Sequence, residues 1–297
     1  MCGCAVGPRA LALSASSASA SASASASSAS QWSARAARSS RAYDRGVSRA
    51  RIHAEVLIVL GLSLGLSALY AIVQLIDAST RGPLSGQTTT LNPSRSDREI
   101  FDLLYQLLSL LGDLVPVALV CYLLWSATRP RLDRLGIDFT RPGRDALQGL
   151  GLAIVIGAGG IGIYLGARAL GLAVGVQANG LTEHWWTIPV LLLSAFRAGA
   201  SEEVIVIGYL FARLREAGWK DWTIIVGAAV LRGSYHLYQG WGGFVGNLIM
   251  GLIFGWLYSR TRRVLPLVIA HTIIDAVVFV GYPWAASTFP ALFGVGR

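Results

Sequence analysis

Two adjacent carboxylates, Glu202 and Glu203, lie within a stretch that is otherwise apolar enough to cross a bilayer. Two histidines, His236 and His271, lie in hydrophobic segments further along the chain. An ionisable side chain at membrane depth costs about 2.5–3.5 kcal/mol or more, so such residues are retained mainly for function. Carboxylate and imidazole groups are also the side chains that activate water. The pattern therefore predicts a water-activating centre assembled from three apolar segments.

The spacing of these residues predicts a common depth and shared helix faces. Counted from the nearest charged loop residues at 1.5 Å per residue, Glu202, His236 and His271 lie roughly 12–23 Å from one membrane surface. Residues four apart share a helix face, so Asp275 can accept a hydrogen bond from His271 and fix its tautomer. Arg232 and His236 have the same spacing. The alternative is that these residues only hold neighbouring helices together.

The composition is that of a membrane protein. The 297 residues are 54% hydrophobic and 14% charged, with a mean hydropathy of +0.55, whereas soluble domains carry about 25% charged residues. The formal net charge of +9 comes from arginine, because Lys220 is the only lysine. In a membrane protein such an excess indicates basic cytoplasmic loops, and no nucleic-acid partner is expected. Cys2, Cys4 and Cys121 form neither a disulfide framework nor a zinc-ribbon spacing.

The predicted fold class is all-α, a polytopic membrane helix bundle. A span needs about 20 mostly apolar residues, and this length gives about seven transmembrane helices. The predicted spans are Glu55–Ile76, Ile100–Ala127, Ala146–Val176, Trp186–Leu214, Trp222–Tyr238, Phe244–Tyr258 and Val264–Tyr282. Basic residues precede the first span and follow the second, fourth and sixth, so the N-terminus is expected in the cytoplasm.

The first 54 residues differ in composition from the rest. Residues 13–30 are almost entirely serine and alanine, and six arginines follow between positions 35 and 51. Such a segment cannot bury enough apolar area to offset chain entropy. We therefore expect a disordered, low-complexity basic tail at 1–54 and a transmembrane domain at 55–297. A transit peptide is the alternative for the tail.

Three short motifs follow one another in the second half of the chain. Residues 202–208 read EEVIVIG, His236 follows, and His271 precedes Asp275 by four positions. In order and spacing these motifs resemble the CPBP family of intramembrane proteases, also called the CaaX protease and bacteriocin-processing, or Abi, family. The resemblance extends over roughly Trp186 to Gly281. It implies a protease-like core at 186–282.

The resemblance implies an intramembrane endopeptidase that acts on membrane-associated or lipidated peptides. The implied catalytic residues are Glu202, Glu203, Arg232, His236, His271 and Asp275. Glu202 is expected to act as general base on a water, while His236 and His271 position that water or stabilise the tetrahedral oxyanion. Because the family has been described both as metalloproteases and as glutamate-dependent proteases, a zinc ion held by Glu202, His236 and His271 is the alternative.

Two positions depart from the family pattern. The first motif of the family ends in Arg-Gly, but this chain has Ile207 at the arginine position. The aromatic residue four positions before the histidine of the second motif is replaced by Arg232. A buried Glu203 without a cation would be costly. We therefore predict that Arg232 supplies the missing cation from the facing helix.

Two other function classes remain open from the sequence. A catalytically inactive CPBP-like scaffold or immunity protein would tolerate Ile207. A proton-coupled transporter would also place glutamate, arginine and histidine at mid-membrane, although the polar residues here crowd into the C-terminal half. The arginine-rich composition suggests a bacterial chain, so the expected location is a bacterial plasma membrane, with a peptide or membrane protein as substrate.

Overall fold

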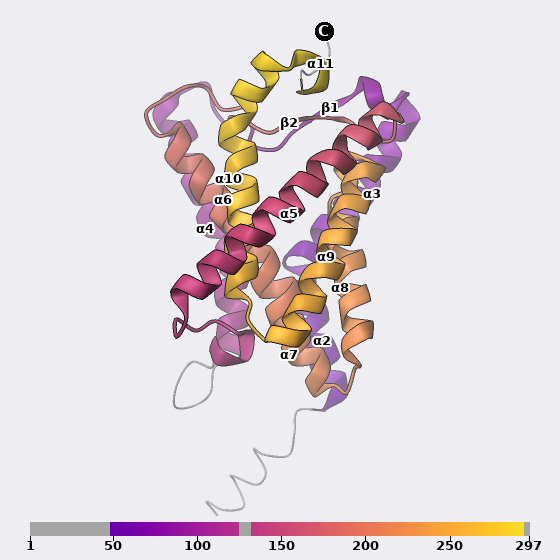
Figure 1. The fold of residues 1–297 in the computed structure, drawn as a ribbon, viewed down its shortest axis with the longest axis vertical. Helices are drawn as coiled ribbons and strands as arrows, with labels where there is room; N and C mark the ends of the chain where they lie inside the picture. Colours follow the sequence, from indigo (N-terminus) through magenta and orange to yellow (C-terminus); the bar gives the residue numbers. More distant parts are fainter. Residues whose placement is uncertain (1–47, 125–131, 294–297) are drawn as a thin grey trace, which may run out of the picture. The chain divides into compact units, whose positions relative to one another are not determined.

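The computed structural model describes residues 48–124 and 132–293, and these residues are mostly helical (Figure 1). The helices are α2 (Arg49–Gly61), α3 (Leu64–Arg81), α4 (Glu99–Leu123), α5 (Pro142–Ala169), α6 (Thr187–Glu202), α7 (Leu210–Glu216), α8 (Asp221–Tyr235), α9 (Trp241–Thr261), α10 (Leu265–Thr288) and α11 (Pro290–Phe293). A π-helical segment, Glu203–Tyr209, joins α6 to α7. The two strands are β1 (Thr88–Thr90) and β2 (Gly175–Gln177).

Each of the seven predicted spans overlaps helical structure, but the third, Ala146–Val176, is too long, because α5 ends at Ala169 and β2 begins at Gly175. By length and composition, α4, α5, α9 and α10 could each cross a membrane, and the pair α2–α3, bent by 54°, adds a fifth candidate. Helices α6 and α8 have only 16 and 15 residues, although α6 continues into the π-helical segment. These apolar helices indicate an integral membrane protein. The count of seven spans and the orientation stay predictions.

The first helix begins within the stretch predicted as a tail. Residues 1–47, with Cys2 and Cys4, lie outside the described residues. Helix α2 starts at Arg49 and buries Ile52, Val56 and Val59. These apolar residues recur at helical spacing and cover one face, so residues 49–54 continue the helical pattern of the segment that follows. The domain boundary at 54 and the disorder of the tail stay predictions.

Helix pairs position the second half of the chain. Helix α6 packs along α10, and α8 packs along α9, while α5 crosses both pairs and contacts α10 and α9 (Figure 1). Helix α4 covers α6, and α3 covers α8. The largest buried apolar cluster runs through the π-helical segment and includes Ile205, Ile207, Phe254 and Leu267. The predicted spans that carry the glutamates and histidines therefore meet in one core.

The strands form a small parallel pair that the all-α prediction missed. Thr88 lies opposite Gly175 and Thr90 opposite Gln177, so β1 and β2 tie together two loops that are distant in sequence. The turn after α8 lies close to the second of these loops. Gly240 has a φ of 89°, and a Cβ there would lie 2.8 Å from the Leu172 carbonyl oxygen, so the turn requires glycine.

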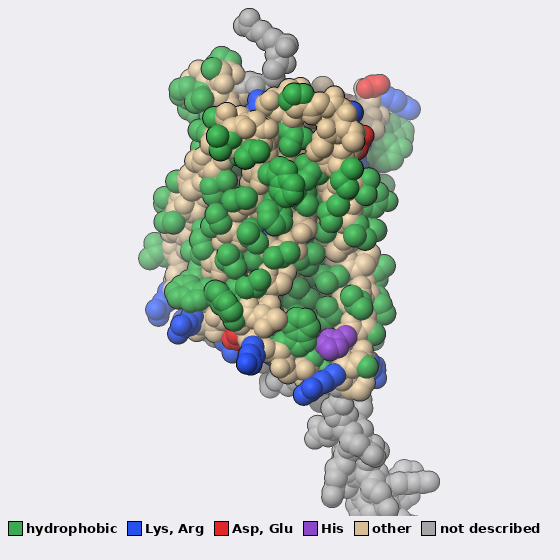
Figure 2. Space-filling view, turned by 90° about the vertical axis from the view of Figure 1, so that its right-hand side faces the viewer, with side chains coloured by type: hydrophobic (Ala, Val, Ile, Leu, Met, Phe, Trp, Pro, Cys, Tyr) green, Lys and Arg blue, Asp and Glu red, His purple; other side chains and the backbone are tan. Residues whose placement is uncertain are grey.

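The surface agrees with embedding in a membrane. Figure 2 shows hydrophobic side chains across the middle of one face, while arginine and lysine side chains gather mostly toward one end. The beginnings of α2 and α5 and the ends of α7 and α9 lie at the same end (Figure 1). The basic regions that the sequence assigned to one side therefore share one end of the helical unit. Which side of a membrane this end faces stays a prediction.

Candidate active site

The two glutamates lie where α6 changes into the π-helical segment. Glu202 is the last residue of α6, and Glu203 is the first of the segment. One turn earlier, Gly199 lies against α10, where a Cβ would be 2.7 Å from Thr272 Oγ1 and 3.1 Å from the Thr272 nitrogen. This glycine permits the close approach of α6 to α10 that brings the glutamates to His271. Short π-helical turns occur frequently at functional sites.

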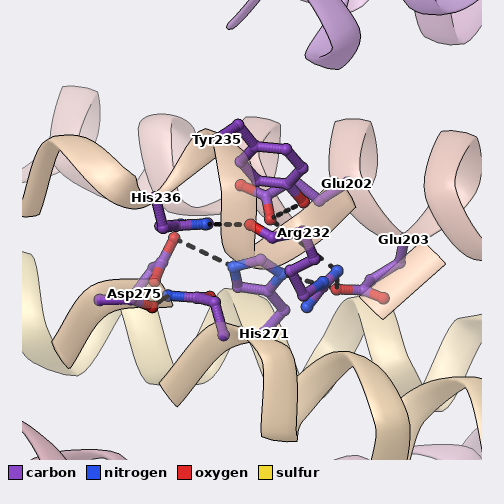
Figure 3. A network of polar contacts seen from close by, with 9 residues as sticks. Glu202, Glu203, Arg232, Tyr235, His236, His271 and Asp275 are labelled. Carbon is purple, nitrogen blue, oxygen red and sulfur yellow. Dashed lines mark hydrogen bonds and ion pairs between the residues drawn. The ribbon is translucent and has the colours of Figure 1, made fainter. Parts of the chain in front are cut away.

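A fully buried cluster of polar groups surrounds Glu203. Arg232, on α8, donates from Nη2 to Glu203 Oε1, and His271 Nδ1, on α10, lies 2.7 Å from the same oxygen (Figure 3). The side chains of Arg232 and Glu203 are 0% exposed, and that of His271 is 6% exposed. An ionised carboxylate only accepts, so Nδ1 carries the proton in this hydrogen bond. The predicted pairing of Arg232 with Glu203 is confirmed.

The position of the family arginine, Ile207, lies in the apolar core and is fully buried. The cation enters from α8 instead, and α9 provides the space for it. A Cβ at Gly251 would lie 3.3 Å from Arg232 Cδ. The guanidinium carbon of Arg232 lies 5.6 Å from the centroid of the Phe254 ring, within the range of a cation–π contact. Glycine and phenylalanine on α9 thus form part of the pocket for the relocated arginine.

Glu202 is more exposed than its neighbour. Its side chain is 12% exposed, against 0% for Glu203. Tyr235 donates from its hydroxyl to Glu202 Oε2 at 2.8 Å, and Arg232 Nη2 lies 3.8 Å from that oxygen (Figure 3). Within the described part of the chain, these contacts of Glu202 all fall on Oε2. Its Oε1 is therefore the oxygen left to accept a proton.

His236 and Asp275 complete the group at its less buried side. His236 Nδ1 lies 3.0 Å from the Arg232 carbonyl oxygen. A carbonyl only accepts, so Nδ1 is protonated and Nε2 of the neutral ring keeps its lone pair. Asp275 Oδ2 lies 3.6 Å from His271 Nε2, beyond hydrogen-bond distance. The predicted pair of His271 and Asp275 is present as a loose contact.

All six predicted catalytic residues therefore lie in one group, drawn from α6, the π-helical segment, α8 and α10 (Figure 3). Residues 184–277 match the family model of Rce1-like type II CAAX prenyl endopeptidases. The match confirms the resemblance to CaaX proteases, and the whole group lies inside the matched residues. It supports an intramembrane endopeptidase family, with peptide substrates and embedding in the membrane. Comparison with curated proteins and with solved structures gives no match.

Residues 184–277, called the Rce1-like segment below, do not form the zinc site that the sequence analysis gave as an alternative. Across residues 48–124 and 132–293, no group of three His, Cys, Asp or Glu side chains is arranged to hold a metal ion. His271 directs one ring nitrogen to Glu203 and the other toward Asp275, and His236 uses Nδ1 for a backbone carbonyl. Each imidazole therefore already has a nitrogen engaged, and no three such side chains are arranged as ligands of one ion among the described residues.

Several polar atoms of the Rce1-like segment are buried without a hydrogen-bond partner among the described residues. They include Nε and Nη1 of Arg232, Oε2 of Glu203 and Oγ1 of Thr272. Most buried polar atoms in native proteins are hydrogen-bonded, and exceptions are found at catalytic sites and where water binds. Arg232, which carries two of these atoms, also approaches Glu202 through Nη2. The group therefore contains buried polar atoms that do not contribute a hydrogen bond to helix packing.

Tyr235 contacts Glu202 but was absent from the predicted catalytic set. Adjacent residues of a helix point in directions 100° apart, so helical spacing did not place Tyr235 beside His236 in one site. Helix α8 ends at Tyr235, and His236 has φ −102° and ψ 5°, outside the helical range. The end of the helix lets both rings approach Glu202, with ring centroids 4.8 Å apart. The position next to the motif histidine was the only signal in the sequence.

Proposed function

We propose that this chain is an intramembrane endopeptidase in which Glu202 activates a water molecule for hydrolysis of a peptide bond. The proposal rests on the environment of Glu202. Glu202 is partly exposed and keeps one oxygen free, and it adjoins a buried support of Arg232, Glu203 and His271 in a segment that matches the Rce1-like model. If Glu202 only held helices together, it would not need a free carboxylate oxygen beside buried charged residues.

The proposed reaction is direct attack by water. Glu202 Oε1 takes one proton from the water as the water oxygen bonds to the carbonyl carbon of the substrate. His236 Nε2 accepts a hydrogen bond from the second proton and so orients the water. The tetrahedral intermediate then collapses, the carbon–nitrogen bond breaks, and Glu202 returns its proton to the leaving amine. Each such proton transfer contributes about 100- to 10,000-fold to the rate.

The buried residues hold this geometry in the proposed mechanism. Arg232 Nη2 reaches both glutamates, so its position sets the distance between Glu202 and Glu203. In its protonated form, His271 donates from Nε2 to the oxyanion that develops on the substrate. Asp275, which lies next to that nitrogen, orients the ring. Electrostatic support of this kind is most effective where water is excluded.

The substrate in this proposal is a peptide at the membrane surface or within the bilayer, lipidated or not. We also propose seven spans, a cytoplasmic N-terminus and a bacterial plasma membrane as the location. The gathering of basic residues at one end of the helical unit supports the orientation (Figure 2). Labelling of single cysteines placed at Glu183 and Lys220, from each side of sealed vesicles, tests it. Equal labelling of both positions from one side would contradict the orientation.

Cleavage by the purified full chain tests the function. Two probes are used, a fluorogenic prenylated peptide ending in a CaaX sequence and a mixture of unmodified membrane-protein peptides read by mass spectrometry. We expect cleavage of at least one probe, and His236→Gln should lower kcat by about 100- to 1,000-fold. The matched control is His184→Gln, a histidine that stacks on Trp186 outside the group and should change kcat by less than about twofold. Equal rates in the two variants, or no cleavage by the wild-type chain, would contradict the proposal.

A further inference from the structure

Tyr235 belongs to none of the three sequence motifs and has no role yet in the proposed mechanism. It is the last residue of α8, and it is buried, at 5% exposed. Its hydroxyl donates to Glu202 Oε2 at 2.8 Å. A hydrogen bond from a neutral donor to a carboxylate is among the stronger hydrogen bonds in proteins. The tyrosine therefore contacts the oxygen of Glu202 that does not face the reaction in the proposed mechanism.

The contacts of Glu202 are unequal on its two oxygens. Tyr235 and Arg232 both approach Oε2, at 2.8 Å and 3.8 Å. The arginine contact is too long for a hydrogen bond, and Arg232 is already committed to Glu203. The tyrosine hydroxyl therefore makes the only hydrogen bond to the Glu202 side chain within the described residues, and it restrains the rotation of the carboxylate more closely than the distant arginine does.

We infer that Tyr235 is a positioning residue that holds the Glu202 carboxylate by Oε2, with Oε1 turned toward the attacking water. The inference rests on the proposed function of Glu202 and adds a determinant of its rate. Without the hydroxyl, the carboxylate rotates about its terminal bond, because such torsions are broad. The reactive geometry is then populated for only part of the time.

Several charged or titratable groups surround Glu202, and all of them are kept when the hydrogen bond from Tyr235 is removed. Glu203 follows Glu202 directly as the first residue of the π-helical segment. Arg232 on α8 and His236 just after that helix face Glu202, and His271 and Asp275 face it from α10. None of these groups is altered when the tyrosine loses only its hydroxyl. A shift in the acid limb of the activity profile therefore reports on the tyrosine bond, since this bond stabilises the ionised carboxylate.

The chain offers a matched control in Tyr238. Both tyrosine rings lie near His236, with ring centroids 4.8 Å away for Tyr235 and 6.2 Å away for Tyr238. The Tyr238 hydroxyl accepts a hydrogen bond from Gln239 Nε2 at 2.9 Å. Tyr238→Phe therefore removes a similar hydroxyl beside the same histidine without removing a bond to a carboxylate.

Steady-state cleavage of the prenylated or unmodified probe is measured across pH for the full chain, Tyr235→Phe and Tyr238→Phe. For Tyr235→Phe we expect kcat to fall by about 10- to 100-fold, with KM within about twofold, and the acid limb to move to higher pH. Tyr238→Phe should keep both the rate and the profile. A wild-type chain that cleaves while Tyr235→Phe keeps kcat and profile overturns the inference and leaves the proposed function standing.

A second measurement separates the inference from the proposed function. The infrared band of the Glu202 carboxylate is assigned by its loss in Glu202→Gln. The band should shift in Tyr235→Phe and stay in place in Tyr238→Phe, whether or not either probe is cleaved. An unshifted band in Tyr235→Phe overturns the inference. Absence of cleavage in the wild-type chain together with a shifted band would count against the proposed function only.

Discussion

Two arginine clusters in the same helical unit use the same residue types in opposite ways. Between α9 and α10, Arg263 donates from all three side-chain nitrogens. Its Nε lies 2.8 Å from Asp145 Oδ1, Nη2 reaches the other Asp145 oxygen and, at 3.1 Å, the Asp138 carbonyl, and Nη1 reaches Asp138 Oδ2. The cluster ties the beginning of α5, the segment before it and the connection from α9 to α10 together.

Arg232 in the candidate active site is bonded through a single nitrogen. Nη2 contacts both glutamates, whereas Nε and Nη1 are buried without a partner among the described residues, as is Glu203 Oε2. Both arginines have little or no exposed surface, but they differ in how their donors are used. The first cluster satisfies its donors, and the second leaves buried polar atoms unpaired. The Arg263 cluster therefore serves stability, whereas the unpaired atoms of the Arg232 cluster cost stability and support the proposed function.

The largest expected effect on stability comes from the Arg263 cluster. Asp145→Ala leaves a buried arginine with one carboxylate partner fewer, which should lower the free energy of unfolding by about 3–5 kcal/mol. Cleavage per folded molecule should stay within about twofold. Unfolding in a detergent titration measures the free energy of unfolding, and the peptide probes measure cleavage. Asp77→Ala, which breaks the exposed pair of Asp77 with Arg81, is the control and should cost less than about 1 kcal/mol. Equal losses in the two variants would remove the contrast.

Arg232→Leu should lower the free energy of unfolding by about 3 kcal/mol, somewhat less than Asp145→Ala, because His271 remains hydrogen-bonded to the buried charge of Glu203. Cleavage should fall by at least about 100-fold. The double variant Arg232→Leu with Glu203→Leu should recover most of the free energy of unfolding, since an apolar pair of this size can replace a buried ion pair. Cleavage should not recover. If the double variant regains cleavage, the pair of Arg232 and Glu203 is not needed for catalysis.

Gly199→Ala tests the approach of α6 to α10. The added Cβ would meet Thr272 at 2.7 Å, so the helices must separate slightly, at about 1–3 kcal/mol. Because the glutamates and His271 lie on these two helices, cleavage should fall by up to about 100-fold. Gly112→Ala, in α4, has no atom within 4 Å of the new Cβ and should change stability by less than about 1 kcal/mol. Similar cleavage in both variants would contradict the tight fit.

The smallest expected effect is a pH dependence at Asp138, which lies outside the candidate spans. Hydrogen bonds from Arg263 and then Thr140 hold the pKa of this carboxyl well below its ordinary value. A pKa that is lower in the folded than in the unfolded chain stabilises the fold above about pH 4, and this stabilisation is lost as the pH falls further. Melting temperatures of the wild-type chain should therefore drop more steeply below about pH 4 than those of Asp138→Asn. Parallel curves would contradict the pairing.

Much of the helical fold could be predicted because membrane spans are specified by local composition. Apolar runs identified all seven helical regions, but not the break at Leu62–Ser63 that bends α2 against α3. The pairing of Thr88–Thr90 with Gly175–Gln177 was also missed. Three-residue strands from distant loops carry no periodic signal, and only the tertiary structure brings them together.

The candidate site was predictable where charge stands out from an apolar background. Glu202, Glu203, His236 and His271 were identified in this way, and the unmet charge of Glu203 led to the pairing with Arg232 that the structure contains. The role of Tyr235 depends on how α8 ends and how its last ring is rotated, which spacing alone does not determine. The close approach at Gly199 depends on the α6–α10 contact in the same way.

The rate of probe cleavage by Glu202→Gln tests the central claim most directly. Glu183→Gln, an exposed glutamate before α6, is the matched control, and both variants are checked for unchanged unfolding. We expect Glu202→Gln to cleave about 100- to 10,000-fold more slowly than the wild-type chain, because the proton acceptor is lost while the shape of the side chain is kept. The control should cleave at the wild-type rate. A folded Glu202→Gln chain that cleaves as fast as the control would contradict the assignment of Glu202 as the base.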